Sequence, residues 1–189
     1  RREAEELLKQ RGRSRDLLIA LAPGAKWRTK RWPEDNYSRL GDLLSQRLSA
    51  DIVIVGDDED RAISIRIAQA MDRKPIQTCG ETSLRQLAAL IEKCALLVSN
   101  DSGPMHLAAA VGTPVVAIFG PTVEEFGFAP RGERNVVLSR PLKCRPCSLH
   151  GRDSCPKGHF LCMRRIEPGE VFEAVLKLWT SVSRTDRDP

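Results

Sequence analysis

The sequence is poor in aromatic residues, which make up 5% of the chain and include a single tyrosine. No apolar run approaches the roughly 20 residues that a membrane-spanning helix needs, so the sequence predicts no membrane span. No Gly-x-Gly-x-x-Gly motif follows a predicted strand, and no Gly-x-x-x-x-Gly-Lys-Ser/Thr motif occurs. These absences argue against an NAD-binding site and against a P-loop nucleotidase.

The sequence also contains few cysteines. Six cysteines among 189 residues are too sparse for a disulfide scaffold, and no secretory signal precedes them. Reduced thiols or a metal site are therefore the better interpretations. The first residue is not methionine, which is consistent with a piece of a longer protein.

The charge balance is mildly basic, with a formal net charge of +5, 41% hydrophobic and 29% charged residues. This composition is that of an ordinary globular protein. Sparse aromatics and the lack of a basic helix argue against a nucleic-acid partner. The positive charge gathers in two places, the turn at 26–31 and the segment 140–165, which holds seven basic residues and one acid.

Short apolar runs alternate with amphipathic stretches along the chain. Strands are expected at residues 17–22, 52–56, 75–78, 95–99, 114–120 and 135–138, and helices at 33–48, 58–71, 83–93, 103–111 and 168–179. The alternation predicts an α/β fold with a doubly wound, Rossmann-like parallel sheet.

The remaining segments complete the predicted organisation. Residues 1–16 are highly charged and are interpreted as an exposed helix or linker, and residues 17–179 as one domain. Within that domain, residues 140–165 form a Cys-rich loop, and residues 180–189 are predicted to be a polar tail.

Ligands in such sheets bind where strands enter the loops at their carboxyl ends. The first of these loops carries Lys26, Arg28, Lys30 and Arg31 at the start of a helix, which suits an anion such as phosphate. A solvated basic turn is the plainer alternative.

A second such loop runs from Ser99 to His106. Gly103 would allow a ligand to approach the backbone, and Asp101 could accept hydrogen bonds from sugar hydroxyls. Capping of the helix by Asp101 or Ser102 explains the same residues equally well. A lone histidine such as His106 is more often a packed or hydrogen-bonded side chain than a catalyst. Glu59, after the second strand, could bind a ribose diol or simply cap a helix.

The Cys-rich loop has a spacing that partly suits a metal. The pattern C-x2-C-x7-C-x6-C comprises Cys144, Cys147, Cys155 and Cys162. A zinc site is chemically sensible and an iron–sulfur cluster is conceivable, whereas free thiols in a long loop are the plainer interpretation.

Several motifs, in one order along residues 17–179, give the chain a resemblance to a known family. They are Pro-Gly-Ala at 23–25, Lys-Arg-Trp-Pro at 30–33, Ser-Asn-Asp-Ser-Gly-Pro-Met-His at 99–106 and Phe-Gly-Pro-Thr at 119–122. Together they resemble the carboxyl-terminal half of the heptosyltransferases, glycosyltransferase family 9. The Cys-x-Pro-Cys and Cys-Pro-x-Gly-His-x-x-Cys-Met segments are most similar to the heptosyltransferase II members.

The resemblance implies a GT-B glycosyltransferase, in which two Rossmann-like domains face a cleft. The carboxyl-terminal domain would bind ADP-heptose. An absent amino-terminal domain would hold the lipopolysaccharide core acceptor and an aspartate base. It implies a cytoplasmic enzyme with peripheral contact to the inner membrane, no cofactor, and no activity for this domain alone. The basic Cys-rich loop would face the anionic acceptor or the membrane.

The resemblance also assigns residues. Lys30 would contact the donor phosphate and sugar, and Asp101 the heptose hydroxyls, and these two are the expected catalytic residues. The expected substrate-binding residues are Gly24, Ala25, Glu59, Thr82, Ser102, Gly103, Pro104 and His106. Within that set, Ser102 and Gly103 would meet the diphosphate, Thr82 the adenine, and Glu59 the ribose, with Asp57 as a rival. No metal ligand is assigned.

Two alternatives remain open at this point. One is a GT-B domain that uses another sugar nucleotide, such as a UDP-sugar. The other is a basic binding module whose Cys-rich loop holds zinc.

Overall fold

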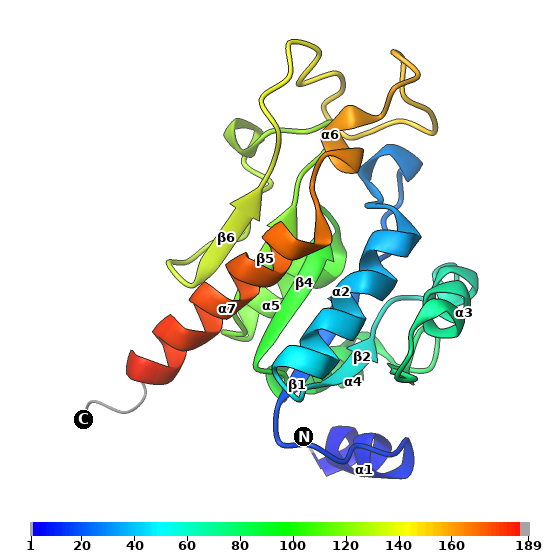
Figure 1. The fold of residues 1–189 in the computed structure, drawn as a ribbon, viewed down its shortest axis with the longest axis vertical. Helices are drawn as coiled ribbons and strands as arrows, with labels where there is room; N and C mark the ends of the chain where they lie inside the picture. The colour runs from blue at the N-terminus through cyan, green and yellow to red at the C-terminus, as the bar shows by residue number, and fades with distance from the viewer. Residues whose placement is uncertain (1, 186–189) are drawn as a thin grey trace.

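The computed structural model describes residues 2–185 and contains one six-stranded parallel sheet (Figure 1). The strands are β1 (Leu18–Ala22), β2 (Asp51–Ile54), β3 (Ile76–Gln77), β4 (Leu96–Asn100), β5 (Val115–Ile118) and β6 (Asn135–Leu138). Their order is β3-β2-β1-β4-β5-β6, with each neighbouring pair parallel. This is the doubly wound dinucleotide-binding order, so the predicted fold class is confirmed.

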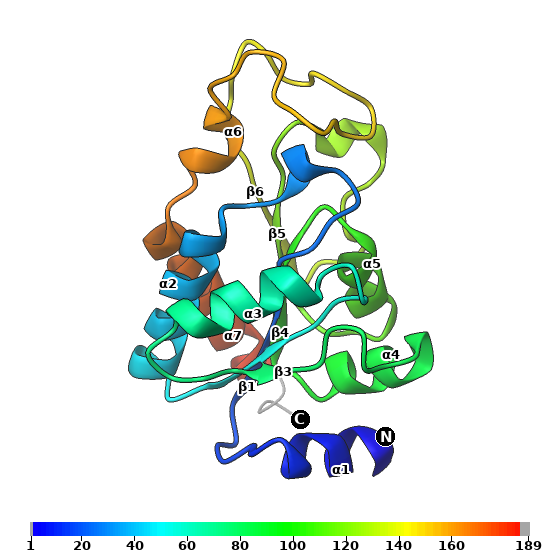
Figure 2. The same ribbon diagram turned by 90° about the vertical axis from the view of Figure 1, so that its right-hand side faces the viewer.

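Helices cover both faces of the sheet (Figure 2). They are α1 (Arg2–Gln10), α2 (Glu34–Arg47), α3 (Arg61–Ala70), α4 (Leu84–Glu92), α5 (Gly103–Ala110), α6 (Leu161–Arg164) and α7 (Pro168–Thr185). Helices α2, α3 and α7 pack in one apolar cluster with the sheet, and α1, α4 and α5 in another. Two 3₁₀ turns, η1 (Arg28–Lys30) and η2 (Glu124–Phe126), lie in the loops after β1 and β5.

The position of β1 inside the sheet, with helices on both faces, explains why its sequence is apolar without interruption. Ile19 and Leu21 pack into the α2–α7 cluster, whereas Leu18, Ala20 and Ala22 pack into the α4–α5 cluster. All five side chains are buried. A strand covered by helices on both faces must be apolar at every position, as the sequence predicted.

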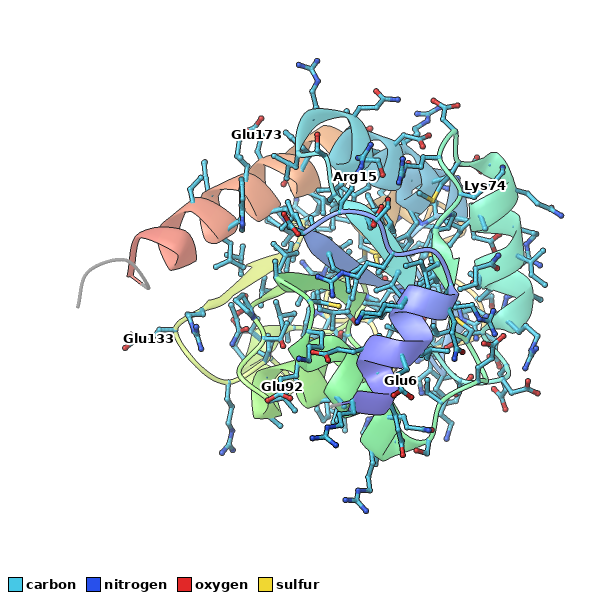
Figure 3. All side chains as sticks on the ribbon, turned by 90° about the horizontal axis from the view of Figure 1, so that it is seen from below. Glu6, Arg15, Lys74, Glu92, Glu133 and Glu173 are labelled. Atoms are coloured by element: carbon cyan, nitrogen blue, oxygen red, sulfur yellow. The ribbon has the colours of Figure 1, made fainter. Side chains whose placement is uncertain are left out.

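Helix α1 lies under the sheet, at the end opposite the carboxyl ends of the strands, beside α4 (Figure 3). The helix forms as predicted, but the expectation that it is exposed is wrong for its inner face. Leu8 is fully buried and Ala4 nearly so, while Glu6 points to solvent. An ion pair between Glu5 and Lys93 adds a contact at its rim.

Helix α7 is longer than predicted and continues to Thr185, so the first residues of the expected polar tail are helical. Leu178 keeps its place in the apolar core, and the hydroxyl of Thr180 donates to the carbonyl of Leu176. Polar residues can extend a helix whose inner stripe is already packed. Residues 186–189 lie outside the described part of the chain.

The Cys-rich loop, 140–165, lies at the end of the molecule to which the strands point (Figure 1). It closes with the short helix α6, which the sequence did not indicate. Across residues 2–185, no helix combines the length and the apolar character needed to cross a bilayer.

Candidate functional site

The order of the strands changes direction between β1 and β4, which lie side by side at the centre of the sheet. From there the chain proceeds to β2 and β3 on one side, and to β5 and β6 on the other. The loops that leave β1 and β4 therefore diverge and open a crevice. In doubly wound sheets this switch point is where ligands bind.

A buried ion pair lies in this crevice. The Nζ atom of Lys30, after β1, is 2.6 Å from Oδ2 of Asp101, after β4. The two side chains are only 11% and 4% exposed. Thr122, after β5, donates its hydroxyl to the same Oδ2 at 2.7 Å. Three loops that are distant in sequence thus meet at one carboxylate. The sequence assigned Lys30 and Asp101 to the site but predicted neither their contact nor the role of Thr122.

The stability of the fold does not by itself explain a buried ion pair of this kind. Removing two charges from water is costly, and well-packed apolar residues of similar volume often stabilise a protein at least as well. A buried Lys–Asp pair at the mouth of a switch-point crevice is therefore better explained by ligand recognition than by folding.

Asn100, the last residue of β4, holds the first loop closed. Its amide nitrogen donates to the carbonyl of Pro23 at 2.7 Å, and its amide oxygen accepts from the backbone N–H of Trp32 at 3.0 Å. The side chain is completely buried. Asn100 therefore fixes both ends of the loop that carries Lys30. The sequence marked its neighbours but assigned Asn100 no role, since only the structure shows what its amide reaches.

Two adjoining pockets open beside the ion pair. The first, of about 460 Å³, is lined by Lys26, Trp27, Lys30, Asp101, Ser102, Gly103, His106, Phe128 and His150. The second, of about 410 Å³, is lined by Gly24, Ala25, Lys26, Arg31, Asp57, Glu59, Asp60, Ser102, Gly103 and Pro104. They share Lys26, Ser102 and Gly103, so together they form one elongated site that crosses the start of α5.

The start of α5 faces open space. A Cβ added at Gly103 would meet no protein atom within 4 Å. The backbone N–H of Gly103 and the positive end of the helix dipole are accessible there, whereas Pro104 has no N–H and Met105 already donates to the carbonyl of Ser102. With Lys26 beside it, this position suits an anion.

Of the predicted site residues, only Thr82 lies away from the two pockets. It contributes to neither lining, and its Oγ1 is buried without a hydrogen-bond partner. The other nine assigned residues line one pocket or both. Their roles toward a ligand remain predictions.

An acidic group at the end of β2 lines the second pocket. Besides the rivals Glu59 and Asp57, it includes Asp60, which sequence reasoning missed. The Asp60 carboxylate fills the space that side chains at Gly24 and Gly56 would need. Burial, and then the charge of Asp57, raise the pKa of Asp60. Gly24 and Gly56, which follow two adjacent strands, could have indicated a buried side chain such as that of Asp60, because each glycine leaves room for a neighbouring side chain.

The wall of the first pocket contains two rings that the sequence did not assign to the site, those of Phe128 and His150. The Phe128 and His150 ring centroids are 5.8 Å apart, and Lys30 Nζ is 5.6 Å from the Phe128 centroid. His150 belongs to the Cys-rich loop, which therefore contributes directly to the site.

The Cys-rich loop is docked on the loop after β1. Thr29 donates its backbone N–H to the carbonyl of Arg152 at 3.0 Å, and its hydroxyl accepts from the Arg152 N–H at 2.7 Å. Gly151 packs so closely on Trp27 that a Cβ there would overlap the indole. This docking joins segments that are far apart in sequence.

The thiols of the Cys-rich loop lie near one another. Burial, and then the charges of Cys155 and Cys144, raise the pKa of Cys147. Burial, and then the charge of Cys147, raise the pKa of Cys162 to about 11. However, nowhere in residues 2–185 do three or more His, Cys, Asp or Glu side chains assemble in a way that could hold a metal ion. The zinc and iron–sulfur interpretations therefore have no geometric support there.

The fold and the site define a Rossmann-type domain whose crevice at the topological switch point suits an anionic ligand. The family model described as "Glycosyltransferase family 9 (heptosyltransferase)" matches residues 1–156. The chain belongs to this glycosyltransferase family, and the resemblance drawn from its motifs is confirmed.

Curated relatives and solved structures agree with this assignment. "Lipooligosaccharide heptosyltransferase 2" of Haemophilus ducreyi is 40% identical over 168 residues, which cover 85% of this chain and 47% of that protein. The Campylobacter jejuni (serotype O:2) protein of the same name is 32% identical over 166 residues, covering 85% and 50%.

The structural neighbours include a glycosyl transferase family 9 protein from Veillonella parvula, with a TM-score of 0.81, 28% identity and 95% coverage of this chain. "E. coli ADP-heptose lps heptosyltransferase II" matches with a TM-score of 0.78, 27% identity and 96% coverage of this chain. The chain covers 51% and 52% of these two structures. It thus spans about half the length of the proteins that it matches.

Proposed function

We propose that the chain is the carboxyl-terminal, donor-binding half of a heptosyltransferase that takes heptose from ADP-heptose. The observation that carries the proposal is the Lys30–Asp101 pair beside the open start of α5, at the point that both pockets share. The printed names of the relatives, which are heptosyltransferases of lipopolysaccharide or lipooligosaccharide, indicate the sugar and the acceptor.

The diphosphate would lie at the shared centre of the site. Ser102, Gly103 and Lys26 line both pockets there, so backbone N–H groups and an ammonium group would face the diphosphate. A helix start and a flanking cation together favour a doubly charged anion.

The sugar would lie in the first pocket and the nucleoside in the second. In the first pocket Asp101 can accept hydrogen bonds from sugar hydroxyls, while Lys30 donates to the sugar or to the nearer phosphate. In the second pocket the carboxylates of Glu59, Asp57 and Asp60 suit a ribose diol. An adenine contact from Thr82 would require the base to extend beyond this pocket.

The reaction that this arrangement serves is an inverting glycosyl transfer. An acceptor hydroxyl attacks the anomeric carbon, its proton passes to a base on the amino-terminal domain, and ADP leaves with the bonding electrons. Negative charge grows on the diphosphate in the transition state. Lys30, Lys26 and the α5 start are placed to stabilise it, and one such donor can contribute about 3 kcal/mol.

The acceptor would be the lipopolysaccharide inner core, held between this domain and the amino-terminal one. We expect the enzyme to act in the cytoplasm, at the cytoplasmic face of the inner membrane. The support is the Cys-rich loop, in which Leu149 is 53% exposed and the neighbouring His150 is exposed. The same loop carries the exposed cations Arg152 and Lys157. A basic surface with an exposed apolar side chain suits an anionic amphiphile.

Titration calorimetry with ADP, ADP-heptose and UDP tests the proposal. We expect the chain to bind ADP and ADP-heptose, to bind UDP much more weakly, and to lose at least tenfold in affinity on Lys30→Ala, because removing one charge-assisted donor costs about 1.5–3 kcal/mol. The matched control is Lys177→Ala, which removes an exposed cation on α7 and should leave binding unchanged. No binding of any nucleotide at millimolar concentration would contradict the proposal, and preference for UDP would favour another sugar nucleotide.

A further inference from the structure

Arg145, in the Cys-rich loop, holds its guanidinium group among polar carbonyls rather than beside an acid. Its Nη2 donates to the carbonyl of Thr122 at 2.7 Å, and its Nη1 donates to the carbonyl of Arg140. Its Nε is buried and has no hydrogen-bond partner. Within residues 2–185, no carboxylate lies within ion-pair distance of it.

Such a cation is costly to keep. Arg145 is half-buried, and partial burial of a charge without a directly paired opposite charge is unfavourable; its unsatisfied, buried Nε adds to the cost. A side chain that served only to pack the loop would be less costly if it were apolar. The arginine therefore indicates a task for its hydrogen bonds.

The hydrogen bond to Thr122 leads directly to the Lys30–Asp101 pair. The Thr122 carbonyl accepts from Arg145, while the Thr122 hydroxyl donates to Asp101 Oδ2 at 2.7 Å. The same Oδ2 is 2.6 Å from Lys30 Nζ. Arg145, Thr122, Asp101 and Lys30 therefore form one continuous series of polar contacts.

Two further contacts attach the Cys-rich loop to the same place. The backbone N–H of Cys147 donates to the carbonyl of Pro121 at 3.1 Å, directly before Thr122. On the other side of the pair, the backbone of Arg152 donates to the hydroxyl of Thr29, the neighbour of Lys30, and accepts from its backbone N–H. The loop thus holds both chain segments that bring the ion pair together.

We infer that Arg145 is a positioning residue that orients Asp101 toward the sugar pocket through Thr122, and so couples the Cys-rich loop to recognition of the donor sugar. The inference rests on the proposed function, since it assumes that Asp101 meets the sugar. Arg145 lines neither pocket and needs no contact with the ligand. The expected effect is therefore on the sugar and not on the nucleotide.

The test compares the affinity of the chain for ADP-heptose with its affinity for ADP. Arg145→Met keeps the length and the apolar part of the side chain but removes all of its donors. It should lower the affinity for ADP-heptose about tenfold, the effect of one lost charge-assisted hydrogen bond, and change that for ADP less than twofold. Arg145→Lys can still donate to the carbonyl of Thr122. It should therefore recover part of the wild-type ratio between the affinities for ADP-heptose and ADP.

Arg140→Met is the matched control. It removes an arginine side chain from the same loop and breaks its contacts with Glu170 and with the carbonyl of Arg165. It keeps the backbone carbonyl of Arg140, which accepts from Arg145. The ratio of the two affinities should stay at its wild-type value.

Thr122→Val provides a second route to the same answer if Arg145→Met folds poorly. It keeps the shape of a fully buried side chain and removes only the hydroxyl that reaches Asp101. It should cause the same selective loss, and the two substitutions together should cost less than their sum.

Two results would overturn the inference. One is that both Arg145→Met and Thr122→Val keep the wild-type ratio between the affinities for ADP-heptose and ADP. The other is an equal loss for ADP and ADP-heptose, which is what general destabilisation of the loop would produce. Failure of the unmodified chain to bind either ligand would instead refute the proposed function itself.

Discussion

The ammonium group of Lys30 and the carboxylate of Asp101 are 2.6 Å apart, although they follow different strands of the sheet. Asn100 and Thr122 determine this distance from either side. Asn100 fixes the loop that carries Lys30, and Thr122 donates to Asp101. The pair is thus organised before any ligand arrives, which reduces the ordering that binding would otherwise require.

Breaking the pair from one side should destabilise the fold. Asp101→Asn leaves the ammonium group of Lys30 buried without its counter-charge, and we expect a loss of about 3 kcal/mol in the free energy of unfolding. The double variant Lys30→Met/Asp101→Asn should lose less than the sum of the single losses. Urea denaturation measures both.

The exposed pair between Arg66 and Glu34 serves as the control. Arg66→Met should hardly move the urea midpoint, because surface pairs contribute little. Additive losses at Lys30 and Asp101 would show that the two charges do not interact as the structure indicates.

A single added methyl group should affect the thermal midpoint differently at two glycines of the site, although it should weaken ADP binding at both. Gly24→Ala places a Cβ on the Asp60 carboxylate, so it should lower both the thermal midpoint and the affinity for ADP. Gly103→Ala places its Cβ in open space at the start of α5. It should leave the thermal midpoint unchanged or raise it, since alanine favours helix, while weakening ADP binding.

Thermal unfolding with and without ADP separates the two effects. A stable Gly103→Ala variant with undiminished affinity would place the ligand away from the α5 start.

The ionisation of Asp60 should make the free energy of unfolding depend on pH. Burial raises the pKa of this carboxyl above its ordinary value of 3.8 in the folded state. Below 3.8 the carboxyl is protonated in both states and has no effect. As the pH rises through the folded pKa, the unfolded state loses its proton more readily, so the wild type becomes less stable.

Asp60→Asn keeps the shape and an oxygen acceptor but cannot ionise. It should therefore be more stable than the wild type at pH 7, and this gain should disappear as the pH falls below 3.8. Denaturation across a pH series tests the prediction. A gain that is equal at all pH values would assign it to packing and not to charge.

Thiol reactivity should differ sharply among the cysteines. Burial raises the pKa of Cys155, but backbone hydrogen bonds from Phe160, Lys157 and Gly158 outweigh it and leave the pKa below 9.0. Burial raises the pKa values of Cys79 and Cys94 to about 12. Because the thiolate is the reacting form, iodoacetamide at pH 8 should modify Cys155 first and leave Cys79 and Cys94 intact.

Peptide mapping of the native protein by mass spectrometry would follow the order of modification. Cys155→Ser should remove the fastest phase. Early modification of Cys94, which is buried in the core, would contradict the packing of α4 on the sheet.

The sequence alone predicted the layers of the fold and the edge of the sheet at which a ligand is expected. Runs such as 17–22 fit strands covered on both faces, and polar, glycine-containing segments after the strands indicated that edge. It also supplied Lys30 and Asp101. It predicted neither the burial of Leu8 in α1 nor the continuation of α7 to Thr185, because a highly charged segment still buries one stripe when a neighbouring surface is apolar.

Only the tertiary structure decided which side chains meet. Asp60 fills a space left by glycines that follow two strands. Asn100 and Arg145 donate to backbone carbonyls, and Thr122 donates to the Asp101 carboxylate, and no sequence pattern reveals where these acceptors lie. Hydrophobic periodicity is a local property that can be read along the chain. Hydrogen bonds between loops depend on how strands are ordered in the sheet, and that order exists only once the chain has folded.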